Sequence, residues 1–224
     1  MNMNQIGKYG IITLCLMISP LLTADPAAET SEAPTTAGSQ TANVKSATVF
    51  LKDVADRLIA KLDADHDAIN SDLSNAVKIV DNIIMPATDF ELIGKRVLGP
   101  HWRTASDAQR QAFLKEFKLL LIITYAAAFR TYKDQTVEFT NEMADPSDPS
   151  RVEVRTKIHQ PGAAPIPVNY RLVLENGAWK VYDFNVDGVG LTSNFRSQFN
   201  NAINQKGIDA VIAEMKKKNV EVFK

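Results

Sequence analysis

The sequence predicts an α+β fold, in which helices precede and follow a curved antiparallel sheet. Apolar residues recur every three or four positions through the first half of the folded region, which is the helical period. Apolar and charged residues then alternate along 151–158, as in a strand with one buried face. The later Asn176-Gly177 pair favours a two-residue hairpin turn, because both central residues of that turn need positive φ. This order of elements predicts a sheet that helices cover on one side.

Residues 1–24 are predicted to be a secretory signal peptide. Lys8 is the only charge in this segment, and the apolar run Ile11–Ile18 follows it. The run gives way to Ser19-Pro20 and to the small residues Thr23-Ala24, where we expect cleavage. Because a membrane-spanning helix needs about 20 apolar residues, the run is too short to cross a bilayer. An uncleaved N-terminal anchor is the alternative interpretation.

The mature chain lacks the residues that several kinds of site require. The single cysteine, Cys15, lies in the predicted signal and follows Leu14 rather than a small residue. We therefore expect no lipid anchor, disulfide or thiol nucleophile after cleavage. Loss of Lys8 leaves 24 of the 25 basic residues against 26 acidic ones, a charge of about −2. A nucleic-acid-binding protein would carry a basic excess, so nucleic acid is not an expected partner.

Residues 25–46 are rich in Ala, Thr, Ser, Pro and Glu and contain almost nothing apolar to bury. This composition predicts a disordered linker. The remaining segment, 47–224, shows no internal repeat and is expected to form one folded domain. Its length is sufficient for a hydrophobic core that stabilises the fold without disulfides.

Three helices are expected in the first part of this domain. Apolar residues at helical spacing mark the first over 50–62 and the second over 69–84. The polar segment Asp63–Asp67 is expected to form a solvated turn between them. A shorter helix over 90–97 should end at Gly99-Pro100, since neither residue continues a helix well.

A longer helix is predicted over 107–132. It opens with a capping box, in which Ser106 and Gln109 satisfy each other's free backbone N–H groups. Its second half, 119–129, is apolar on every face, whereas a surface helix shows only an apolar stripe. This stretch is about half the length of a membrane span, so we expect it to be buried inside the protein. Periodicity does not distinguish a filled core from the wall of a cavity, and both interpretations stay open.

The second half of the domain is expected to form a meander of four strands and two closing helices. Gly188-Val189-Gly190 is interpreted as a turn that leaves the last strand, and Lys206-Gly207 as the break between the helices. The expected strands are 137–143, 152–158, 166–174 and 179–186, and the expected helices are 194–205 and 208–218.

The polar residues form no convincing catalytic or metal-binding pattern. The histidines, His66, His101 and His159, are far apart and lack metal-ligand spacing, and no serine lies in a G-x-S-x-G motif. Tyr170 and Asp183 are the one pair that we nominate for acid–base chemistry, although structural roles suit both better. We therefore expect no enzyme, no metal and no cofactor.

The chain from Pro86 onward contains an ordered set of short motifs, each of them weak alone. They are Pro86-Ala87-Thr88-Asp89-Phe90, Leu98-Gly99, Trp102-Arg103-Thr104-Ala105-Ser106, Gln109-Arg110, Thr124-Tyr125-Ala126, Val154-Arg155-Thr156, Pro165 to Leu172, Trp179 to Asp183, Asn194 to Phe199 and Gly207-Ile208-Asp209. Together they resemble the MlaC family of periplasmic phospholipid-binding proteins, also called toluene-tolerance auxiliary proteins.

The resemblance implies both a fold and a function. The fold is a cystatin-like or nuclear-transport-factor-like curved sheet with a helical lobe, which together enclose an apolar pocket. The function is that of a soluble periplasmic carrier, a monomer, whose cargo is phospholipid and which maintains outer-membrane lipid asymmetry. Its implied partners are an outer-membrane lipoprotein–porin complex and an inner-membrane ABC transporter with a ring of lipid-binding domains.

The physical chemistry of lipid binding agrees with this resemblance. Each buried acyl CH₂ gains about 0.8 kcal/mol, so two chains of about 30 methylenes gain on the order of 24 kcal/mol relative to water. A pocket that shields this much apolar surface must be deep and walled by aliphatic and aromatic residues. The candidate lining residues are Phe90, Ile93, Leu98, Phe113, Phe117, Leu120, Leu121, Tyr125, Val152, Val154, Val168, Tyr170, Leu172, Val181, Phe184, Val189, Phe195 and Phe199.

Two other functions remain as alternatives. A small exported enzyme of the same sheet architecture would use Tyr170 and Asp183, and it would need a compact polar pocket. A protein-binding adaptor or chaperone would have a solid core and no internal cavity.

Overall fold

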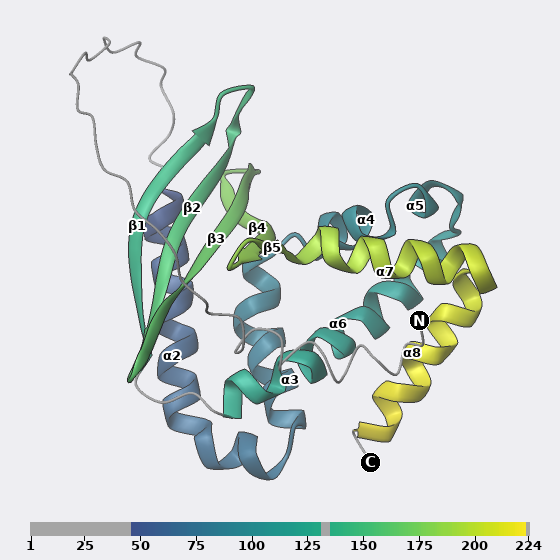
Figure 1. Cartoon of the computed structure of the whole chain (residues 1–224), viewed down its shortest axis with the longest axis horizontal. Coiled ribbons are helices and arrows are strands. Elements are labelled where there is room, and N and C mark those ends of the chain that lie inside the picture. Colours follow the sequence, from purple (N-terminus) through teal and green to yellow (C-terminus); the bar gives the residue numbers. More distant parts are fainter. Residues whose placement is uncertain (1–45, 131–134, 223–224) are drawn as a thin grey trace, which may run out of the picture. The chain divides into compact units, whose positions relative to one another are not determined.

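The computed structural model describes residues 46–130 and 135–222, without the side chains of 126–130. All of these residues belong to one compact unit, Val44–Lys224. The expected signal peptide, 1–24, and all of the expected linker except Ser46 lie outside the described residues. The fold is α+β with an antiparallel sheet, as predicted, and the sheet has five strands where four were expected (Figure 1).

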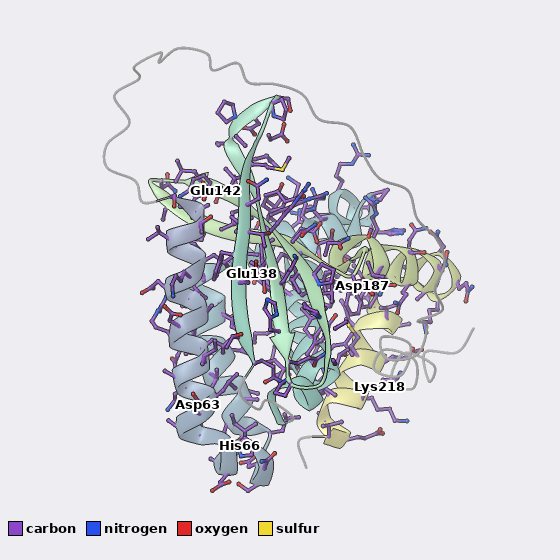
Figure 2. The ribbon with its side chains drawn as sticks, turned by 60° about the vertical axis from the view of Figure 1, so that its left-hand side comes forward. Asp63, His66, Glu138, Glu142, Asp187 and Lys218 are labelled. Atoms are coloured by element: carbon purple, nitrogen blue, oxygen red, sulfur yellow. The ribbon has the colours of Figure 1, made fainter. Side chains whose placement is uncertain are left out.

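The first helix, α2 (Ala47–Ser71), is twice as long as predicted. The expected turn at Asp63–Asp67 is wrong, because this segment is helical, and Figure 2 shows Asp63 and His66 on α2. The segment contains neither Gly nor Pro, and the Lys61–Asp65 ion pair of 2.8 Å spans one helical turn across it. Acidic residues alone do not break a helix.

The break comes instead at Asp72, whose φ of −147° is extended. Its carboxylate accepts a hydrogen bond from the backbone N–H of Ser74 at 2.8 Å, at the start of the next helix. Four short elements follow: α3 (Ser74–Ile79), the π-helical turn η2 (Val80–Ile84), the 3₁₀ turn η3 (Met85–Ala87) and α4 (Phe90–Leu98). Gly99, with φ of 54°, ends α4 where the sequence predicted, and α5 (His101–Thr104) follows.

The long helix is α6 (Asp107–Arg130), and the predicted capping box is confirmed. The Gln109 N–H donates to Ser106 Oγ at 3.2 Å, and the Ser106 N–H donates to Gln109 Oε1 at 2.9 Å. The last two residues of the predicted helix, 131 and 132, lie outside the described residues.

The sheet has the strand order β1-β2-β3-β4-β5, so neighbours in the chain are neighbours in the sheet. Asn176 and Gly177 have φ of 50° and 78°, which confirms the predicted turn between β3 and β4. A second pair of positive φ angles, at Asp187 and Gly188, turns the chain into β5. The prediction of a bare turn at 188–190 missed this strand. The strands are β1 (Thr136–Asp145), β2 (Asp148–Gln160), β3 (Ala163–Glu175), β4 (Ala178–Val186) and β5 (Val189–Gly190).

Irregular pairing bends the sheet. The register shifts between Phe139 and Asn141 on β1, and between Arg171 and Leu172 on β3. Such bulges increase the local twist and curve a sheet. The start of α2 packs on one face of it, and the Thr48 N–H in the first turn donates to Glu142 Oε2 on β1 at 2.7 Å. Figure 2 shows Glu138 and Glu142 on this edge strand.

Two helices complete the fold, α7 (Leu191–Lys206) and α8 (Ile208–Val222), with a break at Gly207 as predicted. α7 begins three residues before the predicted start. Asp183 on β4 explains this, because its carboxylate accepts hydrogen bonds from the Thr192 N–H at 3.2 Å and the Thr192 hydroxyl at 2.8 Å. Helix α7 packs against α4 and β4, and α8 packs against α6 (Figure 1).

Candidate functional site

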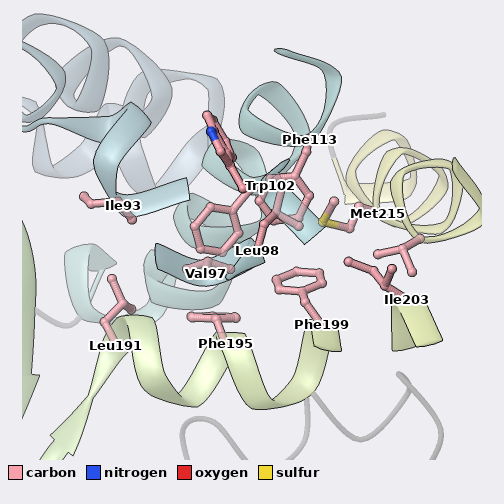
Figure 3. Packing of buried hydrophobic residues seen from close by; sticks show 12 residues of the cluster. Ile93, Val97, Leu98, Trp102, Phe113, Leu191, Phe195, Phe199, Ile203 and Met215 are labelled. Atoms are coloured by element: carbon pink, nitrogen blue, oxygen red, sulfur yellow. The ribbon is translucent and has the colours of Figure 1, made fainter. Parts of the chain in front are cut away.

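The buried apolar residues form three separate clusters rather than one continuous core. The helical cluster joins α4, α5, α6, α7 and α8, and it contains four phenylalanines (Figure 3). The hairpin cluster joins α2, α3, η2 and Ile122 of α6. The sheet cluster joins the first turns of α2 to β2, β3 and β4. Helix α6 contributes to the first two clusters, so the region between α6 and the sheet borders all three.

The helical cluster holds six of the predicted pocket residues as tightly packed core. The rings of Phe113 and Phe117 stack at 5.4 Å between centroids, and the ring of Phe199 meets both edge-on. Figure 3 shows Phe195 and Phe199 on α7 facing this packing. Such close ring contacts leave no room for an acyl chain among these side chains. The six residues are Ile93, Leu98, Phe113, Phe117, Phe195 and Phe199.

The sheet cluster holds four more predicted pocket residues, Val152, Val154, Leu172 and Val181. All four lie under the first turns of α2, where Leu51 is also buried. Val168 is buried on β3 and pairs with Thr156 across the strands. These residues therefore belong to the packed, buried part of the sheet.

Five predicted residues are only half-buried and lie where the clusters meet. Phe90, Leu120, Leu121 and Phe184 pack against the helical cluster, and Tyr170 packs against the sheet cluster. The Tyr170 and Phe184 rings are 6.3 Å apart, so the two groups are neighbours. We define these five residues as the junction residues. Their aromatic and aliphatic side chains pack against core residues and still keep accessible surface.

Tyr170 is the polar residue of this junction. Burial raises the pKa of its hydroxyl from 10.0 to about 12, because the surrounding protein disfavours the charged phenolate. The side chain nevertheless remains partly accessible. No hydrogen bond joins its hydroxyl to another described residue, whereas a buried tyrosine usually finds a partner.

The two remaining predicted residues lie nearer the surface. Tyr125 on α6 is 38% exposed, yet burial raises the pKa of its hydroxyl as well. Val189 on β5 is 54% exposed and packs in none of the three clusters. Sequence reasoning also missed Phe139, which packs against the sheet cluster. The alternation of Val137 and Phe139 with Glu138 and Thr140 could have identified it.

The structure separates the pair that was nominated for acid–base chemistry. Tyr170 pairs with Phe184 across β3 and β4, while Asp183 pairs with Arg171, so the two side chains project from opposite faces of the sheet. The Asp183 carboxylate is bonded to Thr192 and lies 3.5 Å from Arg96 Nη2. It therefore serves as a structural anchor for α7.

The histidines likewise have separate neighbours. His101 Nε2 lies 3.0 Å from Asn200 Oδ1, and His159 Nε2 lies 2.6 Å from Glu138 Oε2. Within residues 46–130 and 135–222, no group of three His, Cys, Asp or Glu side chains could hold a metal ion. In the same part of the chain, no helix is long and apolar enough to span a membrane.

A comparison with protein families shows which family this chain belongs to. The family model described as MlaC protein matches residues 52–217, which is most of the chain.

The chain belongs to the MlaC family.

Two relatives of known name agree with this assignment. The chain is 29% identical over 218 residues to the intermembrane phospholipid transport system binding protein MlaC of Haemophilus influenzae, covering 96% of this chain and 94% of the relative. It is 29% identical over 153 residues to the toluene tolerance protein ttg2D of Pseudomonas putida, covering 68% and 70%. The match to the MlaC family confirms the resemblance found from the motifs.

A solved structure shares the fold. It is the phospholipid-binding protein of Ralstonia solanacearum in complex with a phospholipid, at 29% identity and a TM-score of 0.74. The match covers 80% of this chain and all of the other. The predicted α+β class is therefore confirmed both by the elements of this MlaC-family chain and by its structural neighbour.

Proposed function

We propose that this chain binds phospholipid and carries it as the binding protein of an intermembrane phospholipid transport system. The acyl chains occupy the hollow bordered by the junction residues, between α6 and the sheet. The observation that carries the proposal is the set of junction residues, whose apolar and aromatic side chains pack against two core clusters and still keep accessible surface. The Haemophilus relative is named for this transport system, and the Ralstonia neighbour was solved with a phospholipid.

The three-cluster core supports a hollow that can adjust to its cargo. Helices α2 and α6 each contribute to two clusters, but no buried residue belongs to more than one, so widening the space between clusters costs fewer core contacts than opening a cluster. The junction side chains can then exchange contact with one another for contact with acyl methylenes. Each methylene taken from water contributes about 0.8 kcal/mol, which favours a filled state.

Lipid extraction tests the proposal directly. We would express the full sequence with its predicted signal, purify the protein without detergent, and extract it for quantitative lipid mass spectrometry. About one diacyl lipid, or more, per protein is the expected result. Protein that has been unfolded, washed and refolded without lipid serves as the control. A folded protein that carries no diacyl lipid after purification would overturn the proposal.

The finer features follow from the same function. The carrier works in the periplasm as a monomer, receives or delivers lipid at an outer-membrane lipoprotein–porin complex and an inner-membrane ABC transporter, and maintains outer-membrane lipid asymmetry. It needs no cofactor and catalyses no reaction, because transfer of a lipid between apolar sites breaks no covalent bond. Separation of Tyr170 from Asp183 disfavours the enzyme alternative.

A further inference from the structure

A recess of about 310 Å³ lies between α4 and α5, apart from the junction residues. Leu92 and Trp102 form its apolar floor together with the backbone at Gly99. Three cationic side chains, Lys95, Arg96 and Arg103, line the same recess. Its volume is at the lower end of the range for ligand sites, about 300–1,000 Å³, so it is too small for a diacyl lipid. The recess is therefore a second site with its own chemistry.

Two of the three cations of the recess have side chains without an acidic partner. Lys95 and Arg103 are exposed, and the side chain of neither forms an ion pair or hydrogen bond with another described residue. By contrast, ion pairs hold Lys52, Lys61 and Lys118 on the other helices. A concentration of unpaired positive charge in a chain with net charge −1 creates a local field that attracts anionic groups.

Arg96 adds a fixed positive charge. Its guanidinium lies 3.5 Å from Asp183 Oδ2 and 5.3 Å from the centre of the Tyr182 ring, and these contacts fix its position. Its Nε–H is enclosed by protein and faces no incoming group, but 35% of the side chain is exposed. Arg96 therefore contributes to the recess through the charge of its partly exposed guanidinium.

From these observations we propose that the recess binds an acidic segment of a partner protein that projects one apolar side chain between its carboxylates. The apolar side chain fills the floor on Leu92 and Trp102, and the carboxylates meet Lys95, Arg96 and Arg103. A membrane surface suits the recess less well, because the apolar part of a bilayer lies beneath its head groups and cannot enter a concave site. A protruding side chain can enter, and buried aromatic floors with charged rims are typical of protein-binding hot spots.

The tryptophan on the floor provides a direct readout. We would use the Trp179→Phe variant, which leaves Trp102 as the only tryptophan, after circular dichroism shows that it is folded. The probe is a synthetic peptide of six residues, Glu-Glu-Leu-Phe-Glu-Glu, titrated against the fluorescence of Trp102. We expect saturable binding that weakens with added salt. Two comparison peptides replace either Leu-Phe with Ala-Ala or the four Glu with Lys.

Substitution of the two exposed cations of the recess, Lys95 and Arg103, gives a second test of the proposal; we call these two the rim residues. Lys95→Glu with Arg103→Glu should weaken binding of the acidic peptide by about tenfold or more, because rim charges act through electrostatic complementarity. Lys157→Glu, an exposed lysine on β2 away from the recess, is the matched control and should leave binding unchanged. Both rim residues are exposed, so the variants should fold normally, and their lipid content should equal that of the parent.

Several results would overturn the proposal. They are the absence of binding by the acidic peptide at millimolar concentration, equal binding by the Ala-Ala peptide, and an equal loss of binding in Lys157→Glu. Binding of phosphatidylglycerol vesicles through Lys95 and Arg103, without binding of the peptide, would assign the recess to a membrane surface instead. Because lipid content is measured separately, failure here would leave the proposed lipid-carrier function untouched.

Discussion

At the scale of single residues, burial separates two kinds of apolar side chain that look alike in the sequence. Leu172 on β3 is fully buried in the sheet cluster, whereas Leu121 on α6 is half-buried at the junction. The first supports the fold, and the second borders the hollow that we propose for the acyl chains. Substitution at the two positions should therefore have different consequences.

We expect Leu121→Arg to lose bound lipid while the protein stays folded. The long side chain reaches the hollow, where an unpaired charge is incompatible with acyl chains. Lipid mass spectrometry and circular dichroism of the same sample measure both effects. Leu121→Met is the control and should retain lipid, since its volume and polarity are similar. A folded Leu121→Arg protein with a full complement of lipid would show that α6 does not border the hollow.

The matching change in the sheet, Leu172→Arg, should unfold the protein. The side chain has no accessible surface, and an unpaired charge there has neither water nor a partner. The milder Leu172→Ala is expected to cost about 2–5 kcal/mol of unfolding free energy, as for other large-to-small core changes. Urea denaturation followed by circular dichroism measures this cost. A loss below about 1 kcal/mol would contradict a close-packed sheet cluster.

Ionisation of Tyr170 should affect the stability and the absorbance of the protein at alkaline pH. Burial favours the neutral phenol and raises its pKa from 10.0 in the unfolded chain to about 12 in the fold. Its contribution to stability is complete below pH 10 and is lost as the pH rises from about 10 to about 12. Tyrosinate absorbance should show one group titrating near pH 12, which disappears in Tyr170→Phe. Titration of every tyrosine near pH 10 would mean that the ring is solvated.

At the scale of elements, the ends of the helices are tied to distant parts of the chain by polar side chains. Gln109 closes the capping box of α6 and also donates from Nε2 to Asp209 at the start of α8, at 2.9 Å. Asn219 of α8 donates from Nδ2 to the carbonyl oxygen of Glu116 in α6 at 3.0 Å. These contacts hold α8 against α6.

The Asp183–Thr192 contact is the corresponding tie between the sheet and α7. We expect Thr192→Val to cost about 1–3 kcal/mol of unfolding free energy, because the buried carboxylate loses its hydroxyl donor while the side-chain volume stays nearly constant. Urea denaturation provides the measurement, with the exposed Ser193→Ala next to it as control. An effect no larger than that of Ser193→Ala would mean that α7 is held by apolar packing alone.

At the scale of the whole molecule, the proposed cargo would complete the packing between separate clusters. The junction residues keep accessible surface, and bound acyl chains would cover it. A ligand that binds only the folded state raises stability according to its concentration and affinity.

Removal of lipid should therefore lower the melting temperature. Calorimetry of protein as purified, and of the same protein after delipidation, measures the difference, and readdition of phospholipid should restore the higher value. Leu121→Arg, which is expected to carry no lipid, should already melt near the delipidated value and should not respond to delipidation. Equal melting temperatures with and without lipid would contradict a cargo that completes the core.

Short sequence patterns were sufficient to predict most of the helices and strands. The capping box at Ser106, the glycines at 99, 177 and 207, and the alternation along β2 each depend on a few neighbouring residues, and the structure contains each as predicted. The turn at Asp63–Asp67 was wrong because the helix is held there by side-chain pairs and its actual end depends on Asp72. Such competition between nearby polar residues is not visible in hydrophobic periodicity.

The sequence by itself determined the α+β class, most of the elements, the family and the apolar character of the junction residues. Only the tertiary structure decided which apolar residues are enclosed in a core cluster and which keep accessible surface. Phe117 and Phe90 have the same side chain, yet one is enclosed among other rings and the other lies at the junction. The reason is physical: burial depends on neighbours brought from distant parts of the chain, and a pattern along one helix or strand contains only that element's share of the contacts.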